Sequence, residues 1–256
     1  MPEDRLLMSE GWQERTERLI GQEAMERLAR ARVLVAGVGG VGGYAAEMLA
    51  RSGVGHLTVV DADDVAPSNI NRQIIALHST VGQPKTVLFA TRFRDINPDI
   101  SVDARQEYIT PDNVPELLDG HYDYVIDAID TVAPKMALIC HCLEHRIPVI
   151  SSMGAGGRID PTQVGYFDIS QTRNDGLARV VRQRLRKMGI NRGLKVVAST
   201  EVPHSRALIS LDEPNKKSSF GTLASIPSIF GIFLANHVIQ ALFLKKCIRQ
   251  GGGFSR

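Results

Sequence analysis

Short apolar runs alternate with stretches of helical spacing along the first two thirds of the chain. The runs 33–37 and 56–61 have the length and composition of buried strands, whereas 85–96 has helical spacing and ends at Asn97-Pro98. The predicted elements are a helical arm over 13–30, strands over 33–37, 56–61, 101–105, 122–126 and 147–151, helices over 42–51, 85–96 and 132–144, and a helix start at Thr110-Pro111 with proline in the first turn. Strands that alternate with helices indicate a mostly parallel sheet covered on both faces, the doubly wound α/β fold class.

The segment 221–244 carries no formally charged residue and is long enough to cross a membrane. Pro227 interrupts its early part, and from Ser228 onward apolar side chains recur at helical spacing, as in a buried helix. The pattern favours a C-terminal core or interface helix over 221–250. Contact with a membrane is the alternative.

Length and composition fit a single domain of a cytoplasmic protein. The chain has 256 residues, 30 Lys+Arg against 28 Asp+Glu, and three cysteines, an odd number that does not make a disulfide framework. The first 32 residues are rich in charge and hold no apolar signal core. We divide the domain into a helical arm over 1–31, a nucleotide-binding core over 32–165, a basic substrate-binding region over 166–220 and the C-terminal helix.

A glycine loop joins the first predicted strand to the helix that follows it. Gly37, Gly39, Gly40 and Gly42 provide the bare backbone that lets a phosphate approach a helix N-terminus. Asp61 ends the next strand, about 20 residues later, where a ribose hydroxyl is usually held. This Rossmann-like pattern fits NAD as well as ATP.

The segment after Asp61 favours ATP. A cluster of polar side chains precedes Lys85, which begins a predicted helix, and such a cluster suits the extra negative charge of a triphosphate under attack at its α-phosphorus. Asp130, at the end of a later strand, is placed to hold Mg²⁺ on those phosphates. The cluster comprises Ser68, Asn69, Asn71, Arg72 and Gln73.

Residues 173–195 are strongly basic. They hold eight Lys or Arg and one acid, a net +7, so the remainder of the chain carries −5 against the total of +2. In a helix over 177–188, apolar side chains share one face, and the opposite face carries a basic stripe. Charges of one sign repel one another unless a polyanion binds, so we expect this helix to contact a nucleic-acid backbone. The candidate contacts are Arg179, Arg182, Arg186 and Lys187.

Together these motifs resemble those of the E1-like (ThiF-type) adenylating family, which includes ubiquitin-activating domains and sulfur-carrier adenylyltransferases. The matching positions are Gly37 to Gly42, Asp61, Asp63, Ser68, Asn69, Asn71, Arg72, Gln73, Gly82, Lys85, Asp127 and Asp130. Motifs within 151–163, 174–182 and 196–201 are similar to those of its tRNA threonylcarbamoyladenosine dehydratase branch. The resemblance implies that ATP converts the threonylcarbamoyl carboxylate on adenosine 37 of tRNA to an acyl-adenylate. The carbamoyl group of the same side chain then closes on the activated carbonyl, and AMP leaves.

The resemblance also implies a role for each candidate residue. The glycines shape the loop under the nucleotide, Asp61 takes the ribose hydroxyls, and Arg72 and Lys85 stabilise charge as pyrophosphate leaves. Asp130 holds Mg²⁺, and Asp127 finishes the strand. An arginine of the helical arm reaches the γ-phosphate of the other subunit in the family, which predicts a homodimer. Arg18 matches that position, and Arg15 is the fallback. For Arg72 and Lys85 the alternative is a surface salt bridge.

Three other functions stay open. An adenylyltransferase for a ubiquitin-like sulfur carrier is the main alternative, although the chain lacks the paired Cys-x-x-Cys motifs of many such enzymes. A non-enzymatic binding subunit would be expected to have lost Arg72, Lys85 or Asp130, and an NAD oxidoreductase is the remaining option. Cys140 and Cys142 are expected to be structural, and His141 with His145 lacks a third metal ligand. Also open are a monovalent cation at the loop 154–157, an accessory protein of the sulfur-transfer type, the base for ring closure and the choice of tRNA.

Overall fold

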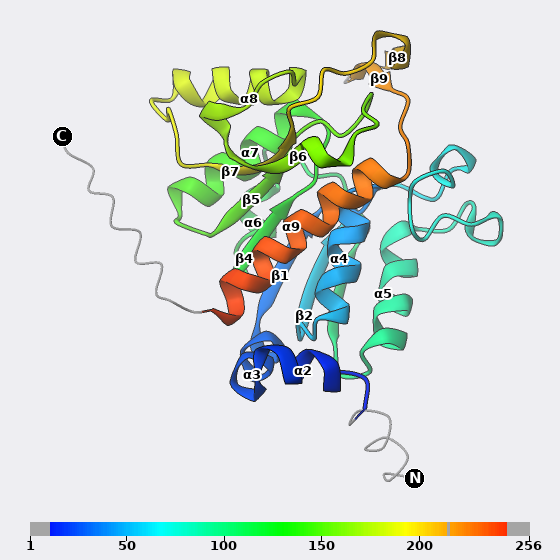
Figure 1. Ribbon diagram of the computed structural model, residues 1–256, viewed down its shortest axis with the longest axis vertical. Coiled ribbons are helices and arrows are strands. Elements are labelled where there is room, and N and C mark those ends of the chain that lie inside the picture. The colour runs from blue at the N-terminus through cyan, green and yellow to red at the C-terminus, as the bar shows by residue number, and fades with distance from the viewer. Residues whose placement is uncertain (1–10, 214–215, 245–256) are drawn as a thin grey trace.

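A seven-stranded sheet with the strand order β3-β2-β1-β4-β5-β7-β6 forms the centre of the molecule (Figure 1). The computed structural model describes residues 11–213 and 216–244, with the backbone alone over 208–219. All neighbouring strands run parallel except β6, which pairs antiparallel with β7 at one edge. The strands are β1 Arg32–Ala36, β2 His56–Val60, β3 Ser101–Arg105, β4 Tyr124–Asp127, β5 Val149–Ser152, β6 Val164–Asp168 and β7 Lys195–Ser199. A separate antiparallel pair consists of β8 Leu208–Glu213 and β9 Lys216–Phe220.

Helices cover both faces of the sheet, as the alternation of apolar runs and helical spacing predicts. Successive side chains of β1 enter different cores: Val33 and Val35 join one, and Leu34 and Ala36 join the other. The first core is closed by α4, α5 and α9, which face the viewer in Figure 1, and the second by α6 and α7. The helices are α2 Glu14–Ile20, α3 Gln22–Arg30, α4 Gly42–Arg51, α5 Lys85–Ile96, α6 Val114–Leu117, α7 Val132–Glu144, α8 Gly176–Lys187 and α9 Ser225–Phe243. The predicted doubly wound α/β class is confirmed.

The predicted helical arm over 13–30 is confirmed and consists of two helices, because Gly21 turns the chain at φ 82° between α2 and α3. Two other local predictions are wrong. Thr110 does not start a helix: its N–H donates to Asn113 Oδ1 in a turn, and α6 begins only at Val114. Pro227 does not interrupt the last helix, since it lies in the first turn of α9, where a missing N–H costs nothing.

The last helix is a core helix of this domain. α9 buries one side against α4 and the sheet, with side chains such as Phe230, Leu234 and Val238 fully covered. By length and composition alone α9 could also span a membrane, a test that the core helix of a soluble protein passes equally. The part of the predicted helix beyond residue 244 lies outside the described residues.

Candidate functional site

The glycine loop lies where β1 meets α4, at the carboxyl edge of the sheet. Gly37 has φ +83°, a conformation that favours glycine, and a Cβ on it would lie 3.1 Å from the carbonyl oxygen of Ala128. A Cβ on Gly42 would lie only 1.8 Å from the oxygen of Gly37. The first turn of α4 can therefore sit directly against the end of β1, with its N–H groups directed at the loop.

Asp61 is joined to this loop through its carboxylate. Oδ2 accepts a hydrogen bond of 2.8 Å from the N–H of Val38, and Oδ1 accepts one of 3.0 Å from Asp63. Lys85 Nζ lies 3.5 Å from Asp61 Oδ1. The structure thus brings the end of β2, the glycine loop and the start of α5 together.

Lys85 is buried between two carboxylates. Its side chain is 4% exposed, and Nζ donates a 2.7 Å hydrogen bond to Asp63, whose side chain is 59% exposed. An exposed carboxylate is a partner that Lys85 can exchange for a phosphate oxygen without leaving a buried charge unpaired. The sequence singled out Asp63 only as a position that matches the family, and it did not predict this ion pair.

The segment 67–73 places Arg72 and Gln73 next to the glycine loop. A Cβ on Gly40 would lie 3.3 Å from Arg72 Cγ, and a Cβ on Gly39 would lie 3.6 Å from Gln73 Nε2. Arg72 Nη1 donates to the carbonyl of Ser68 at 2.8 Å and to Asn71 Oδ1 at 2.9 Å. Asn69 is buried, and its Oδ1 accepts from the N–H of Ala66, so this oxygen holds the turn.

The glycine loop, Asp61, Lys85 and the segment 67–73 together form a site, here called the nucleotide cradle, that fits a nucleotide. Gln73 is 7% exposed, and its Oε1 is buried without a hydrogen-bond partner among the described residues, which is costly unless a donor arrives. A hydroxyl or amino group of a nucleotide is such a donor. The bare backbone of Gly39 and Gly40 leaves room beside it, and Lys85 and Arg72 provide positive charge for phosphates.

The strand β4 delivers Asp130 to the same edge through a buried polar triad. Asp127 and Lys135 form an ion pair of 2.6 Å with neither side chain exposed, and Ser151 donates to the same carboxylate oxygen. The other oxygen of Asp127 accepts from the N–H of Ile129, which fixes the loop that carries Asp130. Asp130 itself is exposed, ahead of α7. Asp127 finishes the strand as predicted, whereas Lys135 gave no signal in the sequence.

The loop 154–157 is held by a second buried ion pair. Arg158 lies 3.3 Å from Asp175 and donates to the carbonyls of Gly154, Gly156 and Asn174. Burial lowers the pKa of Arg158, against the opposing effect of Asp175. Asp175 also accepts from the N–H groups of Gly154 and Ala178, so one carboxylate joins this loop to the start of α8. The only hint in the sequence was that Asp175 is the lone acid among basic residues.

The basic helix divides its cations between two roles. Arg182 is part-buried and donates to the carbonyls of Thr172 and Ile169, which corrects its predicted place on the open stripe. Arg179, Arg186 and Lys187 are exposed. An open hollow of about 530 Å³ on α8 is lined by Val180, Gln183, Arg184, Arg186 and Lys187.

Several remaining candidates do not take part in the nucleotide cradle. Arg18 is 78% exposed and pairs with Glu14 on the same helix. The rings of His141 and His145 stack at 4.0 Å, and the described residues hold no group of three metal-ligating side chains. Burial raises the pKa of the Cys142 thiol to about 12 and that of Cys140 in the same direction, which agrees with structural roles. Cys247 lies outside the described residues.

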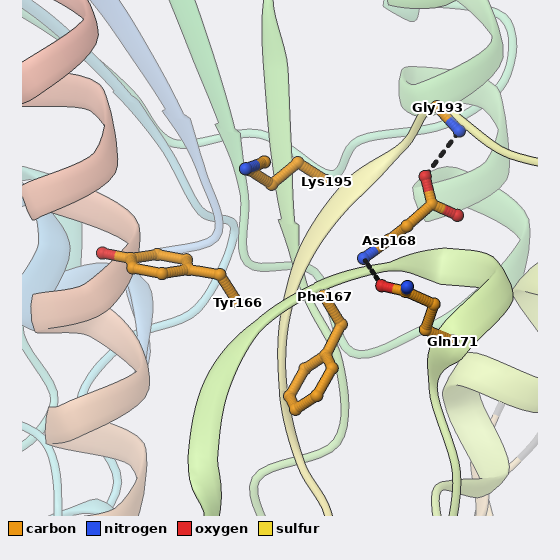
Figure 2. A pocket seen from close by; sticks show the side chains of 6 residues that line it. All are labelled: Tyr166, Phe167, Asp168, Gln171, Gly193 and Lys195. Atoms are coloured by element: carbon orange, nitrogen blue, oxygen red, sulfur yellow. Dashed lines mark hydrogen bonds between the residues drawn. The ribbon is translucent and has the colours of Figure 1, made fainter.

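A second hollow, of about 290 Å³, lies at the other end of the sheet (Figure 2). Lys195 begins β7, so this hollow lies at the amino end of that strand and away from the glycine loop. Figure 2 shows Tyr166 and Phe167 on opposite sides of β6, and Asp168 accepting from the N–H of Gly193 at 2.6 Å. The Asp168 carboxylate is already hydrogen-bonded to the loop at Gly193, and we assign this hollow no part in the nucleotide site.

Comparison with known proteins places the chain among adenylating enzymes. The ThiF family matches residues 13–254. The tRNA threonylcarbamoyladenosine dehydratase of Bacillus subtilis is 45% identical over 236 residues, which cover 89% of this chain and 93% of the relative. That of Escherichia coli is 39% identical over 267 residues, covering 96% and 99%. The crystal structure of the E. coli enzyme, TcdA, in complex with ATP superimposes with a TM-score of 0.84 over 93% of this chain and 97% of that one.

Proposed function

The chain belongs to the ThiF family, and from this membership we propose that it is an ATP-dependent tRNA threonylcarbamoyladenosine dehydratase. One observation carries the proposal: the likeness to dehydratases of this name extends over 96% of this chain and 99% of the E. coli relative. The match therefore includes the basic region and α9 as well as the nucleotide cradle. A match to the adenylating core alone would leave the substrate open.

The reaction has two steps. A carboxylate oxygen of the threonylcarbamoyl group attacks the α-phosphorus of ATP, and pyrophosphate leaves with the electron pair of the broken bond. The carbamoyl group then attacks the activated carbonyl and loses a proton as AMP departs. Over the two steps the modified nucleoside has lost one water. Both reacting groups of the second step belong to one side chain, so a high effective molarity replaces an external nucleophile.

The cradle residues supply binding and charge. We assign the ribose hydroxyls to Asp61, and the phosphates to the glycine loop, Ser68, Asn69, Asn71 and Gln73. Arg72 and Lys85 stabilise the charge that develops on the departing pyrophosphate. Asp130 would hold Mg²⁺, which would screen the phosphate charge when bound.

The remaining assignments concern partners. The exposed cations Arg179, Arg186 and Lys187 contact the tRNA backbone, the enzyme works in the cytoplasm as a homodimer, and Arg18 reaches the partner's nucleotide. Residues 32–165 bind ATP, and residues 166–220 bind the tRNA. If an accessory protein of the sulfur-transfer type takes part, α9 is the helix on which it would dock. Arg158 already places a cation against the carbonyls of Gly154 and Gly156, so the proposal contains no monovalent ion.

The test is dehydration of tRNA that carries threonylcarbamoyladenosine, followed by mass spectrometry of the nucleoside, together with ATP–pyrophosphate exchange. We expect the nucleoside to lose one water only when ATP is present. Arg72→Ala and Asp130→Asn should each lower the rate by about 10²–10³-fold. Asp112→Asn, an exposed carboxylate in a turn, is the control and should leave the rate unchanged. An unchanged nucleoside, with exchange stimulated by a carrier protein ending in Gly-Gly, would establish the sulfur-carrier alternative.

A further inference from the structure

Phe220 lies against the bare backbone of the loop 154–157. A Cβ on Gly156 would lie 2.7 Å from Phe220 Cβ, and one on Gly157 would lie 2.9 Å from Phe220 Cδ1. The phenylalanine ends β9 and is nevertheless 37% exposed. One part of this side chain is therefore seated on glycine backbone while another part faces solvent.

Backbone hydrogen bonds hold the segments beside Phe220 together. Gly157 donates to the carbonyl of Gly221 at 2.9 Å, and Gly221 donates to Ala207 at 2.7 Å. His204 donates to the carbonyl of Gly157 at 2.8 Å. The segments around Gly157, Ala207 and Gly221 are therefore joined beside Phe220, whose side chain packs against Gly156 and Gly157 on one part and stays exposed on another.

A short chain of hydrogen bonds connects the backbone of Phe220 to the nucleotide cradle. Thr222 Oγ1 donates to the carbonyl of Phe220 at 3.0 Å, and Asn71 Nδ2 donates to the carbonyl of Thr222 at 3.2 Å. Asn71 Oδ1 accepts from Arg72, whose stem lies under Gly40. Phe220 is thus linked through its backbone carbonyl to the rim of the site where ATP is proposed to react.

The surroundings suit a nucleotide of single-stranded RNA. Exposed Arg206 and His204 belong to the segment that hydrogen-bonds with Gly157 and Gly221. The guanidinium of Arg206 at such a rim can contact phosphates, and His204, whose Nε2 lies 3.5 Å from Glu201 Oε1, adds a ring nitrogen that can hydrogen-bond to them. Proteins that bind RNA loops stack the splayed bases on exposed aromatic rings. Aliphatic side chains would give the same burial without the π-face.

On the basis of the proposed function, we propose that Phe220 is the stacking platform for the base of the threonylcarbamoyl-modified adenosine. The ring holds the adenine at the rim so that its threonylcarbamoyl carboxylate extends into the ATP cradle. The ribose and flanking phosphates then face Arg206 and His204. Phe220 is a binding residue for tRNA and takes no part in proton transfer.

The experiment compares Phe220→Leu, Phe220→Trp and the wild type. Leucine keeps an apolar contact on Gly156 and Gly157 but has no π-face, so kcat/KM for modified tRNA should fall by about 5–100-fold through KM. Tryptophan should keep kcat/KM within about twofold of the wild type. The dissociation constant for ATP should stay the same in both variants, and Leu223→Ala, 55% exposed, is the control for loss of a nearby apolar side chain. Equal KM values for Phe220→Leu and the wild type would overturn the proposal.

A spectroscopic measurement separates stacking from support of the loop. Trp12 is the only tryptophan, so Phe220→Trp in a Trp12→Phe background reports on position 220 alone. We expect modified tRNA to quench this fluorescence, and unmodified tRNA to quench it less. Absence of quenching by a tRNA that is still dehydrated would contradict the stacking role. Failure of the wild type to dehydrate the nucleoside would instead refute the proposed function.

Discussion

At the scale of single residues, buried charges set the positions of the loops that carry the site. Lys135 holds Asp127 behind the loop with Asp130, and Arg158 holds Asp175 behind the loop 154–157. Each pair is almost fully buried and makes further hydrogen bonds to backbone groups or Ser151. Such pairs add little net stability over apolar residues, but removal of one member leaves the other as an uncompensated charge. We infer that they specify loop geometry.

Replacement of Lys135 by methionine should therefore destabilise the protein strongly. Asp127 would remain buried without its cation, and we expect the free energy of unfolding to fall by about 3–5 kcal/mol. Arg105→Met is the matched control, because its ion pair with Asp103 is 34% and 51% exposed, and it should cost less than about 1 kcal/mol. Urea denaturation of both variants measures the difference. Similar losses of unfolding free energy in the two variants would show that the buried pair contributes no more to stability than the exposed one.

His237 should make the stability depend on pH. Burial, assisted by Lys195, lowers the pKa of His237 to about 4, and its Nε2 lies 3.0 Å from the hydroxyl of Tyr124. The unfolded imidazole binds a proton near pH 6.5, so between there and pH 4 the unfolded state holds more protons than the native state. Stability from this group is present above pH 6.5 and is lost as the pH falls towards 4.

Urea midpoints of the wild type and His237→Gln across this range provide the test. The wild type should lose more stability than the variant on acidification, and His121→Gln, an exposed histidine, should behave like the wild type. Parallel curves for the wild type and His237→Gln would mean that this imidazole titrates alike in both states.

At the scale of elements, contact between α4 and α9 determines the shape of the cradle. A Cβ on Gly231 would lie 2.3 Å from the carbonyl oxygen of Val41 and 2.9 Å from Tyr44 Cβ, so the two helices touch through bare backbone. Pro227, one turn earlier in α9, would be 3.5 Å from a Cβ on Gly40. The helix that closes the core therefore also borders the phosphate loop.

Gly231→Ala should push α9 away from α4 and lower both the stability of the protein and its affinity for ATP. Overpacking of this kind costs about 1–3 kcal/mol, and we expect weaker ATP binding because the neighbour of Gly40 moves. Gly176→Ala is the control: nothing lies within 4 Å of its Cβ position, and α8 should be unchanged or slightly more stable. Thermal unfolding with and without ATP measures both effects. Normal ATP binding by the Gly231→Ala protein would show that the position of α9 does not determine the shape of the cradle.

Most elements could be predicted from the sequence because their signals are local. The helices 42–51, 85–96 and 132–144 and the strand 101–105 have the predicted bounds, since apolar spacing and proline or glycine stops act within a few residues. The turn that delays α6 depends on Asn113, and α9 starts before Pro227 because a proline in the first turn of a helix removes no hydrogen bond. The glycine loop, Asp61, Arg72 and Lys85 could be predicted as one cluster because parallel strands end at one edge. The partners of Lys135 and Arg158 could not, since the fold brings them together from distant segments.

At the scale of the whole molecule, charge is distributed unevenly. The segment 173–195 carries +7 and the remainder −5, and the exposed cations of α8 surround a hollow. Arg186→Gln with Lys187→Gln should weaken tRNA binding and lower the slope of log K against log salt by about one to two, with ATP affinity unchanged. The double variant Arg30→Gln with Arg94→Gln, at exposed positions outside α8, is the matched control. Equal salt slopes in the two double variants would exclude α8 from the tRNA interface.

Arg182→Gln should mainly reduce stability, because its guanidinium donates a hydrogen bond to Thr172.

The proposed homodimer makes a prediction that only mixed subunits can test. Arg18 lies on the exposed side of α2 and contributes nothing to the cradle of its own subunit, so Arg18→Ala and Arg72→Ala should each be inactive for different reasons. In a mixed dimer, the Arg72→Ala subunit supplies Arg18 to the intact cradle of the other subunit. Half of the dimers in an equal mixture are mixed and each has one working site, so refolding the variants together should restore about a quarter of the wild-type rate. Arg15→Ala replaces Arg18→Ala if the fallback arginine is the one that acts. An inactive mixture with either arm variant would mean that no arginine of the arm reaches across the interface, since action within one subunit cannot be restored by mixing.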